Sequence, residues 1–361
     1  MDVTQDELTL LRKVRDDVAE PSTTALNAGR AALLEAAEPA AAKPIKPHRA
    51  LRRAGWTTLG VVAAGGLATA LVLGNVIGLA GWRGGADPAA ADSLSRAAAA
   101  TIKTADPVVG PGQYLEVSTK AVYAAISQSS TYLAHQDGQV YIPADHDADW
   151  VWVRDPETAA KTFGPASERQ AAEEAPTTSA PDIIRAAQGA FYNGRPMDWG
   201  LRALPHDPQQ LLNYIYRTTA GRGVSPDGEA LGTIADILRT GVVPAELRAV
   251  LYRALAGIPG VTISDTTATL DGRTGVAFGR DEGNGLRQEI IIDPATGLMI
   301  GEREVVLREG VLPGVPAGES MGWTSVTTTV VDAAPSGGTL CGTGMHPVGA
   351  AGSGQCAGAG K

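Results

Sequence analysis

Residues 286–307 read LRQEIIIDPATGLMIGEREVVL, and this stretch decides the fold of the chain around it. A strand-like apolar run ends at Asp293, and Asp293-Pro-Ala-Thr-Gly297 has the composition of a tight turn. A second strand-like run follows from Leu298 to Leu307. Because two strands joined by so short a turn run antiparallel, the stretch predicts neighbouring strands of an antiparallel sheet.

Further strand signals lie on both sides of this turn. They are found at residues 113–117, 131–142, 149–154, 261–263, 275–278 and 323–331. Residues 131–142 are expected to form a hairpin that turns at Asp137-Gly138. Residues 155–181 are polar and hold several prolines, so a loop is expected there.

Three amphipathic helices are predicted between the two groups of strands. The first begins at Asp207-Pro208, the second covers Glu229–Arg239, and the third begins at Pro244. Strands, then helices, then strands, without βαβ alternation, predict an α+β fold with an antiparallel, curved sheet and a helical insertion. This domain is expected to cover residues 113–333.

Leu59 to Ala80 is a run of 22 residues without a charged side chain. As a helix it would be about 33 Å long, enough to cross a hydrocarbon core of about 30 Å. Trp56 and Trp82 stand at its two ends, where tryptophan favours the membrane interface. The sequence therefore predicts one transmembrane helix at 59–80, and a buried helix of a soluble domain is the alternative.

The charged residues around this run predict its orientation. Residues 43–58 hold five basic and no acidic side chains, whereas the chain from Arg83 onward is acidic overall. The positive-inside rule then places the N-terminus in the cytoplasm and the C-terminal domain outside the membrane. The run lies too far from the N-terminus for a cleaved secretory signal, so an uncleaved single-pass anchor in the cell membrane is expected.

Residues 1–58 are predicted to be a cytoplasmic tail with two short amphipathic helices and a basic membrane flank. The first helix carries Leu8, Leu11, Val14 and Val18 at helical spacing and ends at Pro21. So short a tail cannot bury a core, so it is either a partly ordered tail or a docking element that folds on a partner.

Two further segments complete the predicted organisation. Residues 81–112 are expected to form a stalk with an Ala-rich helical piece from Ala89 to Lys103. Residues 334–361 are rich in glycine and lack periodicity, so a disordered tail is expected. Cys341 and Cys356 lie in that tail, where an oxidising environment permits a local disulfide.

Composition excludes several functional classes. The net charge is −9 and aromatic residues make up only 5%, which argues against nucleic-acid binding as the main activity. Two cysteines cannot build a zinc-finger module. Neither a phosphate-binding loop nor a paired-histidine metal motif is present, so no cofactor, metal or catalytic residue is predicted.

One motif does resemble catalytic machinery. Gly318-Glu-Ser320-Met-Gly322 matches G-x-S-x-G, and Asp332 and His346 follow in the order that hydrolases use. The nucleophile of that motif must stand between a strand and a helix, but here two prolines precede the motif and a strand follows it. A serine hydrolase that uses Ser320 is therefore only a remote alternative to a surface loop.

Asp145-His146-Asp147-Ala-Asp149 resembles the opening of a calcium-binding loop. Trp150 stands where such a loop needs glycine, and Pro156 stands where it needs glutamate. The other candidate ligands, His135 and His206, are scattered along the chain. A solvated acidic turn is the expected structure.

Several stretches resemble one family of proteins. They are residues 6–21 followed by a basic flank and an apolar span, residues 251–261, residues 289–298 and residues 301–303. They are similar to an actinobacterial family of uncharacterised single-pass membrane proteins with an acidic cytoplasmic tail and an extracellular α+β domain. The resemblance covers nearly the whole chain except the glycine-rich tail, and it carries over no catalytic or binding residues.

A second resemblance concerns architecture alone. Strands, a helical insertion and strands are similar to the half-barrels of lipoprotein carriers and of periplasmic regulators of anti-sigma factors. That likeness implies a half-barrel-like sheet that holds an acyl chain, or a sensor that acts on a sigma-factor circuit.

Together these features predict a non-enzymatic, membrane-anchored sensor or regulator. Its outer domain is expected to bind an apolar ligand or a protein partner, and residues 1–42 a cytoplasmic regulatory protein of the sigma-factor type. A lipid- or lipoprotein-binding module without signalling is the alternative.

Small residues line one ridge of the apolar span, at Gly66, Ala70, Gly74 and Gly78. Such a ridge would allow two helices to approach closely in a homodimer, and the Ala- and Gly-rich composition of the whole chain is the alternative explanation for it. Gly74→Ile together with Gly78→Ile should abolish the signal of a membrane dimerisation reporter. An unchanged signal would contradict dimerisation through this face.

Overall fold

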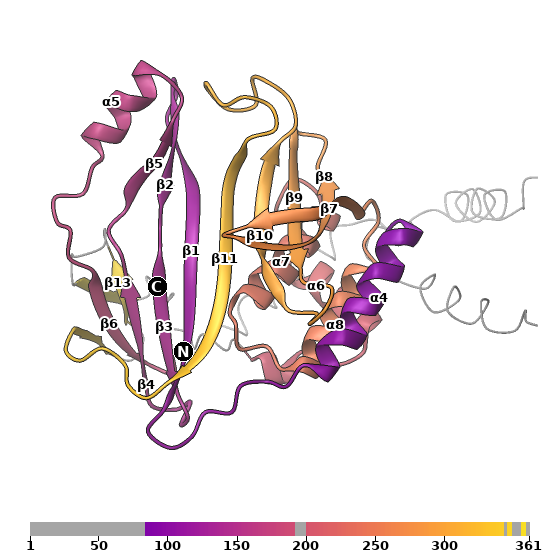
Figure 1. Cartoon of the computed structure of the whole chain (residues 1–361), viewed down its shortest axis with the longest axis horizontal. Helices are drawn as coiled ribbons and strands as arrows, with labels where there is room; N and C mark the ends of the chain where they lie inside the picture. Colours follow the sequence, from indigo (N-terminus) through magenta and orange to yellow (C-terminus); the bar gives the residue numbers. More distant parts are fainter. Residues whose placement is uncertain (1–83, 192–199, 343–344, 349–354, 359–361) are drawn as a thin grey trace, which may run out of the picture. The chain divides into compact units, whose positions relative to one another are not determined.

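The computed structural model describes residues 84–191, 200–342, 345–348 and 355–358 (Figure 1). The first part holds α4 (Pro88–Lys103), β1 (Tyr114–Ile126), β2 (Thr131–His135), β3 (Gly138–Pro143), β4 (Asp149–Arg154), β5 (Thr158–Thr162), α5 (Pro165–Glu173) and β6 (Asp182–Ala187). The second part holds the 3₁₀ turn η1 (Leu201–Ala203), α6 (Pro208–Thr218), α7 (Pro226–Arg239), α8 (Ala245–Leu255), β7 (Thr262–Leu270), β8 (Arg273–Asp281), β9 (Leu286–Ile292), β10 (Met299–Val306), β11 (Ser320–Val331), β12 (Thr339–Cys341), β13 (Met345–Val348) and β14 (Gln355–Gly358).

A large curved sheet connects most of these strands. Its order is β12-β6-β4-β3-β1-β11-β10-β9-β8-β7, with β2 and β5 joined beside β1. Neighbours on this path are antiparallel, except that β12 pairs with β6 in parallel. Figure 1 shows β1 and β11 side by side in the middle of the sheet, which does not close into a barrel. The α+β class with an antiparallel sheet is confirmed.

The expected hairpin at Asp137-Gly138 is wrong. β2 and β3 both pair with the same edge of β1 in one continuous register, so the chain does not reverse between them. The carboxylate of Asp137 accepts the backbone N–H of Ala121 at 2.9 Å, which satisfies the donor where the ladder is interrupted. The reversal lies instead between β1 and β2, at residues 127–130.

The expected loop at 155–181 contains two regular elements. β5 pairs with β2 alone among the described strands, and its residues are exposed or half-buried. α5 begins at a proline and covers β2, where Ala171 packs on Tyr132 and Ala134. Short elements with few apolar residues leave little hydrophobic periodicity, which is why polarity alone indicated a loop.

The helical insertion lies where it was predicted, between β6 and β7. The carboxylate of Asp207 caps α6 by accepting the N–H of Gln210, and the hydroxyl of Ser225 caps α7 by accepting the N–H of Gly228. α7 begins three residues earlier than predicted because Ser225 and Pro226 supply this start signal. Leu231 and Ile234 of α7 are fully buried, in the same cluster as Ile290 of β9.

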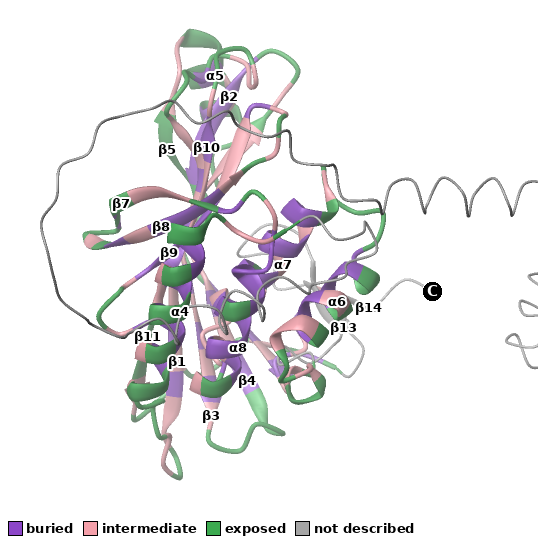
Figure 2. Ribbon diagram, turned by 90° about the vertical axis from the view of Figure 1, so that its right-hand side faces the viewer, coloured by how far each residue is buried: buried purple, intermediate pink, exposed green. Residues whose placement is uncertain are grey.

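The expected stalk is wrong for α4, which belongs to the folded domain. Ala90, Leu94 and Ala98 are fully buried, and α4 packs against α8. Figure 2 shows buried and exposed residues alternating along α4. The small alanine side chains let the helix axis approach closely, whereas a stalk would leave them in water. The domain therefore begins near residue 85 rather than at 113.

The turn at 293–297 holds α4 in place. Gly297 lies so close to α4 that a Cβ built on it would stand 2.4 Å from the carbonyl oxygen of Ala97. Its φ of +67° also favours glycine. The buried hydroxyl of Tyr252, on α8, donates to the carbonyl of Gly297 at 2.8 Å. One turn thus joins the sheet to both α4 and α8.

The expectation of a disordered tail at 334–361 is wrong for the described residues. β12 pairs with β6, β13 pairs with β14, and a disulfide joins Cys341 to Cys356. Cys341 is buried beside Trp150 and Ile184 in a second hydrophobic cluster. Backbone pairing and the disulfide order this segment although glycine supplies few apolar side chains. The predicted disulfide is confirmed.

Within the described residues, no helix is long and apolar enough to cross a bilayer. The predicted span at 59–80, its ridge from Gly66 to Gly78 and the tail at 1–42 all lie outside the described residues. The membrane anchor, the homodimer and the cytoplasmic partner therefore stay predictions.

The close approach of Gly297 predicts the effect of a single methyl group. Gly297→Ala should lower the free energy of unfolding by about 2–4 kcal/mol, because the Cβ must displace the backbone of α4 as well as strain φ. Gly272→Ala is the matched control, since Gly272 also has positive φ but has open space around its Cβ. Its expected cost is about 1 kcal/mol. Chemical denaturation of the full chain in detergent measures both, and equal losses would contradict the contact.

Candidate functional site

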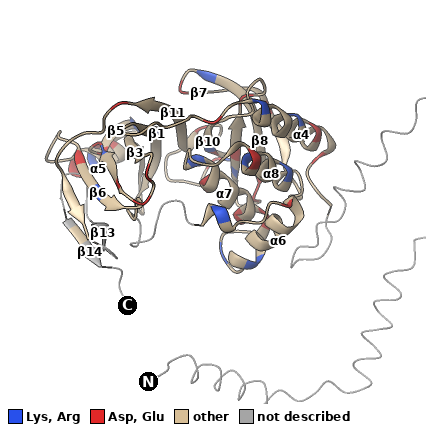
Figure 3. Ribbon diagram, turned by 90° about the horizontal axis from the view of Figure 1, so that it is seen from below, with Lys and Arg blue, Asp and Glu red and all other residues tan. Residues whose placement is uncertain are grey.

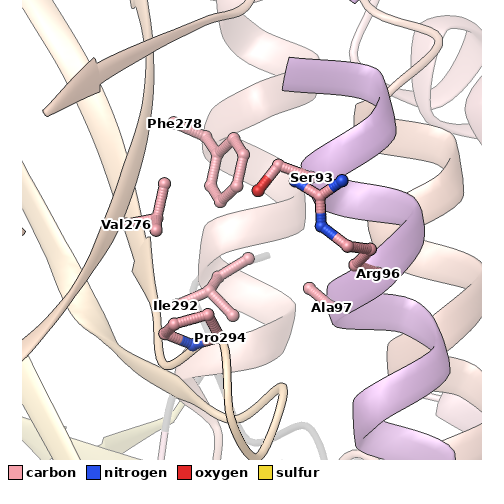
Figure 4. Close-up of a pocket in the computed structure, with 7 residues that line it drawn as sticks. All are labelled: Ser93, Arg96, Ala97, Val276, Phe278, Ile292 and Pro294. Carbon is pink, nitrogen blue, oxygen red and sulfur yellow. The ribbon is translucent and has the colours of Figure 1, made fainter. Parts of the chain in front are cut away.

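A small pocket lies between α4 and the sheet (Figure 4). Its apolar wall consists of Val276 and Phe278 on β8, Ile292 on β9 and Pro294 in the following turn, and α4 contributes Ser93, Arg96 and Ala97. Figure 4 shows Phe278 and the side chains of α4 on opposite sides of the cavity. The pocket therefore combines an apolar interior with one hydroxyl and one guanidinium group.

The pocket has a volume of about 70 Å³. That is space for about two water molecules, whereas sites for drug-sized ligands enclose about 300–1,000 Å³. Arg96 is largely exposed and pairs with Asp92 one turn earlier on α4. A pocket of this size fits one apolar side chain, and Arg96 lies where it can bind an acceptor next to that side chain.

The pocket does not lie between the helices at 207–257 and the sheet, a place for which the sequence leaves open whether an apolar cavity exists. There the helices pack directly on the strands, and Leu231, Ile234 and Ile290 have no exposed surface. The described pocket is formed instead by α4.

A polar cluster lies beneath the C-terminal end of α7, on the same face of the sheet. Arg239 donates to Glu302 on β10 at 2.8 Å and to the hydroxyl of Tyr123 on β1 at 3.3 Å. Tyr123 also shares a hydrogen bond with Thr324 on β11. The Glu302 side chain is only 12% exposed, so water solvates its carboxylate poorly and Arg239 is the group that stabilises its negative charge. Arg239 thus joins α7 to β10 and β1, and Tyr123 extends the hydrogen-bond network to β11.

The environment of this cluster changes the acidity of two carboxyl groups. Burial raises the pKa of Glu302, and the charge of Arg239 opposes that rise. Burial also raises the pKa of Glu304, and the charge of Glu282 adds to the rise. Glu302 and Glu304 are two residues apart on one strand, so they lie on the same face.

A second polar cluster lies at the other end of α7. Arg280 on β8 pairs with Glu282, and it donates to the hydroxyl of Ser225 at 2.9 Å and approaches Asp227 at 3.4 Å. The hydroxyl of Tyr216 donates to Asp227 at 2.8 Å. Arg280 pairs with both carboxylates, so the three groups together keep one negative charge, and they join the start of α7 to the sheet.

A third ionic cluster lies on the opposite face. Glu289 has no exposed surface and pairs with Arg287 at 2.7 Å and with Arg303 at 2.5 Å. Arg303 also approaches Asp265 on β7. Because two cations flank this buried carboxylate, we assign the cluster to the stability of the sheet.

The structure does not bring the residues of the G-x-S-x-G motif into a catalytic arrangement. Ser320 begins β11 and Asp332 follows its end, so up to about 40 Å of extended strand separates them. The nearest acceptors to the Ser320 hydroxyl are the backbone oxygens of Glu304 and Gly322, both at 3.4 Å. Asp332 accepts from Gln113 at 2.8 Å. The motif stands between a turn and a strand, as expected from its prolines.

The acidic stretch at 145–149 forms the exposed turn between β3 and β4. Asp145 accepts the N–H of Asp147, and Asp147 accepts from Gln188. These carboxylates stabilise the turn. Among the described residues, no group of three His, Cys, Asp or Glu side chains is arranged to hold a metal ion.

The sequence did not single out the pocket or the cluster around Arg239. The pocket residues are ordinary apolar or polar types from segments almost 200 positions apart, so only the fold brings them together. The cluster does leave a signal, because Glu302 and Glu304 are two residues apart in the strand predicted from Leu298 to Leu307 and therefore fall on one face of it.

No protein-family model matches the chain, and no curated protein matches it in sequence.

The raised pKa of Glu302 predicts a pH-dependent stability. The folded chain holds the proton of this carboxyl more tightly than the unfolded chain does. Its contribution therefore favours folding at pH below about 4.3 and is lost as the pH rises through the raised pKa. As the pH rises from about 4.3 through the raised pKa, the free energy of unfolding of wild type should fall progressively relative to that of Glu302→Gln.

Urea unfolding of both full-length proteins at several pH values measures this difference. Glu302→Gln keeps every other titrating group, so the two curves differ only through this carboxyl. A difference that stays constant with pH, or that changes in favour of wild type, would contradict the assignment.

Proposed function

We propose that this chain is a non-enzymatic, single-pass membrane protein whose outer domain binds a protein partner as part of a sensor or regulator. In this proposal Leu59–Ala80 is the anchor, residues 1–58 lie in the cytoplasm and the domain described above lies outside the cell membrane. The positive flank at 43–58 supports the orientation. The disulfide between Cys341 and Cys356 supports an oxidising compartment for the domain.

The observation that carries the proposed binding function is the size of the pocket beside α4. A cavity of about 70 Å³ with apolar walls matches one aliphatic side chain of a partner. Small pockets that receive one anchoring side chain are typical of the energetically important points of protein interfaces.

Binding of a lipid or lipoprotein without signalling is the alternative. A half-barrel-like shape of the curved sheet, as in lipoprotein carriers, would support it. An acyl chain needs a much longer cavity than the pocket beside α4, and the helices at 207–257 pack tightly on the sheet. We therefore favour a protein as the ligand. The separation of Ser320 from Asp332 gives the hydrolase alternative no support.

The cytoplasmic half of the proposal rests on residues 1–42. Two short amphipathic helices too small to bury a core are suited to folding on a partner, which we propose to be a regulatory protein of the sigma-factor type. The proposed anchor would then couple the binding of a partner by the outer domain to the binding of the regulatory protein by residues 1–42.

A substitution that fills the pocket tests the proposed binding of a protein partner by the outer domain. Ser93→Trp should occupy the cavity and reduce partner recovery when the full chain is purified from native membranes after cross-linking. Ser95→Trp is the matched control, because Ser95 lies on the same helix, is exposed and does not line the pocket. We expect a protein that wild type and Ser95→Trp recover equally and that Ser93→Trp recovers at least about tenfold less, which corresponds to about 1.4 kcal/mol.

Equal recovery of every protein by all three variants would contradict binding through this pocket. Native mass spectrometry of the same samples tests the alternative. A stoichiometric lipid that is lost in Ser93→Trp would favour lipid binding over a protein partner.

A further inference from the structure

The chain enters the folded domain at a fixed point. The backbone N–H of Ala86 donates to the carbonyl of Ala256 at 3.0 Å, and that of Asp87 donates to Val261 at 2.8 Å. Both acceptors belong to the segment between α8 and β7. The start of α4 is therefore bound to residues 256–261.

The distance from this point to the proposed anchor is short. Five residues lie between Ala80, the last residue of the predicted span, and Ala86. Whatever conformation they take, the six residue steps from Ala80 to Ala86 span at most about 20 Å. If residues 59–80 cross the membrane, the end of the domain at 256–261 must lie close to the outer leaflet.

The loop between α6 and α7 lies at this same end. Arg280 donates through Nε to the carbonyl of Pro259 at 2.9 Å and through Nη1 to the hydroxyl of Ser225 at 2.9 Å. The guanidinium group of Arg280 thus contacts Pro259, in the segment that binds the start of α4, and also Ser225, the residue after Val224. Ser225 and Pro259 therefore lie within reach of one arginine side chain.

This end presents apolar and basic side chains to solvent. Val224 is 64% exposed and Tyr214 is 39% exposed, although both are large apolar or amphipathic residues. Arg217, Arg222 and Arg253 are exposed on α6, on the following loop and on the last turn of α8. Figure 3 shows basic residues on α6 and α8.

The exposed carboxylates nearby, Asp87 and Asp281, are fewer than the three exposed arginines. Asp87 is exposed and caps α4, and Glu229 is half-buried beside Gly223. Asp227 is buried and Glu282 is half-buried, and both pair with the single Arg280, which leaves one negative charge among these three groups, while Asp281 beside them is exposed. Exposed aliphatic and aromatic side chains among arginines are the combination that binds an anionic membrane surface.

We infer that this end of the domain, defined by Tyr214, Arg217, Arg222, Val224 and Arg253, rests on the outer leaflet of the membrane that holds the anchor. Val224 and Tyr214 enter the interfacial layer, and the arginines contact anionic phospholipid headgroups. The inference rests on the proposed anchor and adds an orientation to it. α4 then leads away from the membrane over about 24 Å.

A fluorescent reporter at Val224 tests this orientation. The only two cysteines of the chain form a disulfide, so Val224→Cys supplies a single thiol for an environment-sensitive NBD dye. The full chain is placed in nanodiscs of phosphatidylcholine and phosphatidylglycerol. We expect the emission to shift to shorter wavelength on reconstitution and to be quenched by headgroup-proximal spin-labelled lipid.

Val108→Cys is the matched control. Val108 is 87% exposed and lies beyond the far end of α4, next to Asp106, which accepts the N–H of Ala245 at the start of α8. Its dye should show neither the shift nor the quenching. Equal behaviour of the two dyes would overturn the inference.

The same samples separate this inference from the proposed function. If the chain is held by the nanodisc but the Val224 dye stays in water, the orientation is wrong while the anchor stands. If the chain stays outside the nanodisc, the proposed anchor and the inference both fail. Arg217→Glu with Arg222→Glu should reduce the quenching of the Val224 dye, and unchanged quenching would overturn the assigned role of the arginines.

Discussion

The close approach of α4 to the turn at 293–297 is the contact on which the rest of the domain depends. Only glycine allows it, because any Cβ at Gly297 would meet the backbone of α4. The same turn joins β9 to β10 and accepts a hydrogen bond from Tyr252 on α8. A helix of small residues is thereby held on a sheet although alanine supplies little hydrophobic burial. The pocket exists because α4 crosses β8 and β9 at this distance.

This arrangement links the features from which function is proposed. α4 follows the predicted membrane span after a few residues, lines the pocket and is bound to residues 256–261 at its start. In the proposed topology, a stalk would let the domain move freely above the membrane, whereas a packed α4 fixes the point at which the chain from the proposed anchor enters the domain. A partner that occupies the pocket would then contact the helix that follows the proposed anchor. Such a contact is a direct route by which binding outside could affect the anchor.

Local signals in the sequence predicted much of the second half of the domain. Asp207 with Pro208 and Pro244 mark helix starts, and Asp293 with Gly297 marks a turn, because each acts on its own backbone. Pairing between distant segments could not be predicted in this way. The Asp137-Gly138 pair has hairpin composition, but β2 and β3 both pair with β1. The alanines of α4 suit a stalk as well as a core, and the pocket needs three segments that only the fold brings together.

Hydrogen–deuterium exchange of the full chain in a membrane mimetic tests the central claim that α4 is part of the domain core. If the claim is correct, the amides around Leu94 and Ala98 should exchange as slowly as those of α8 and β9, and all should lose protection together as denaturant is added. Amides of α4 that exchange as fast as those of the exposed turn at 145–149, while α8 and β9 stay protected, would show that α4 is a stalk and would contradict the account.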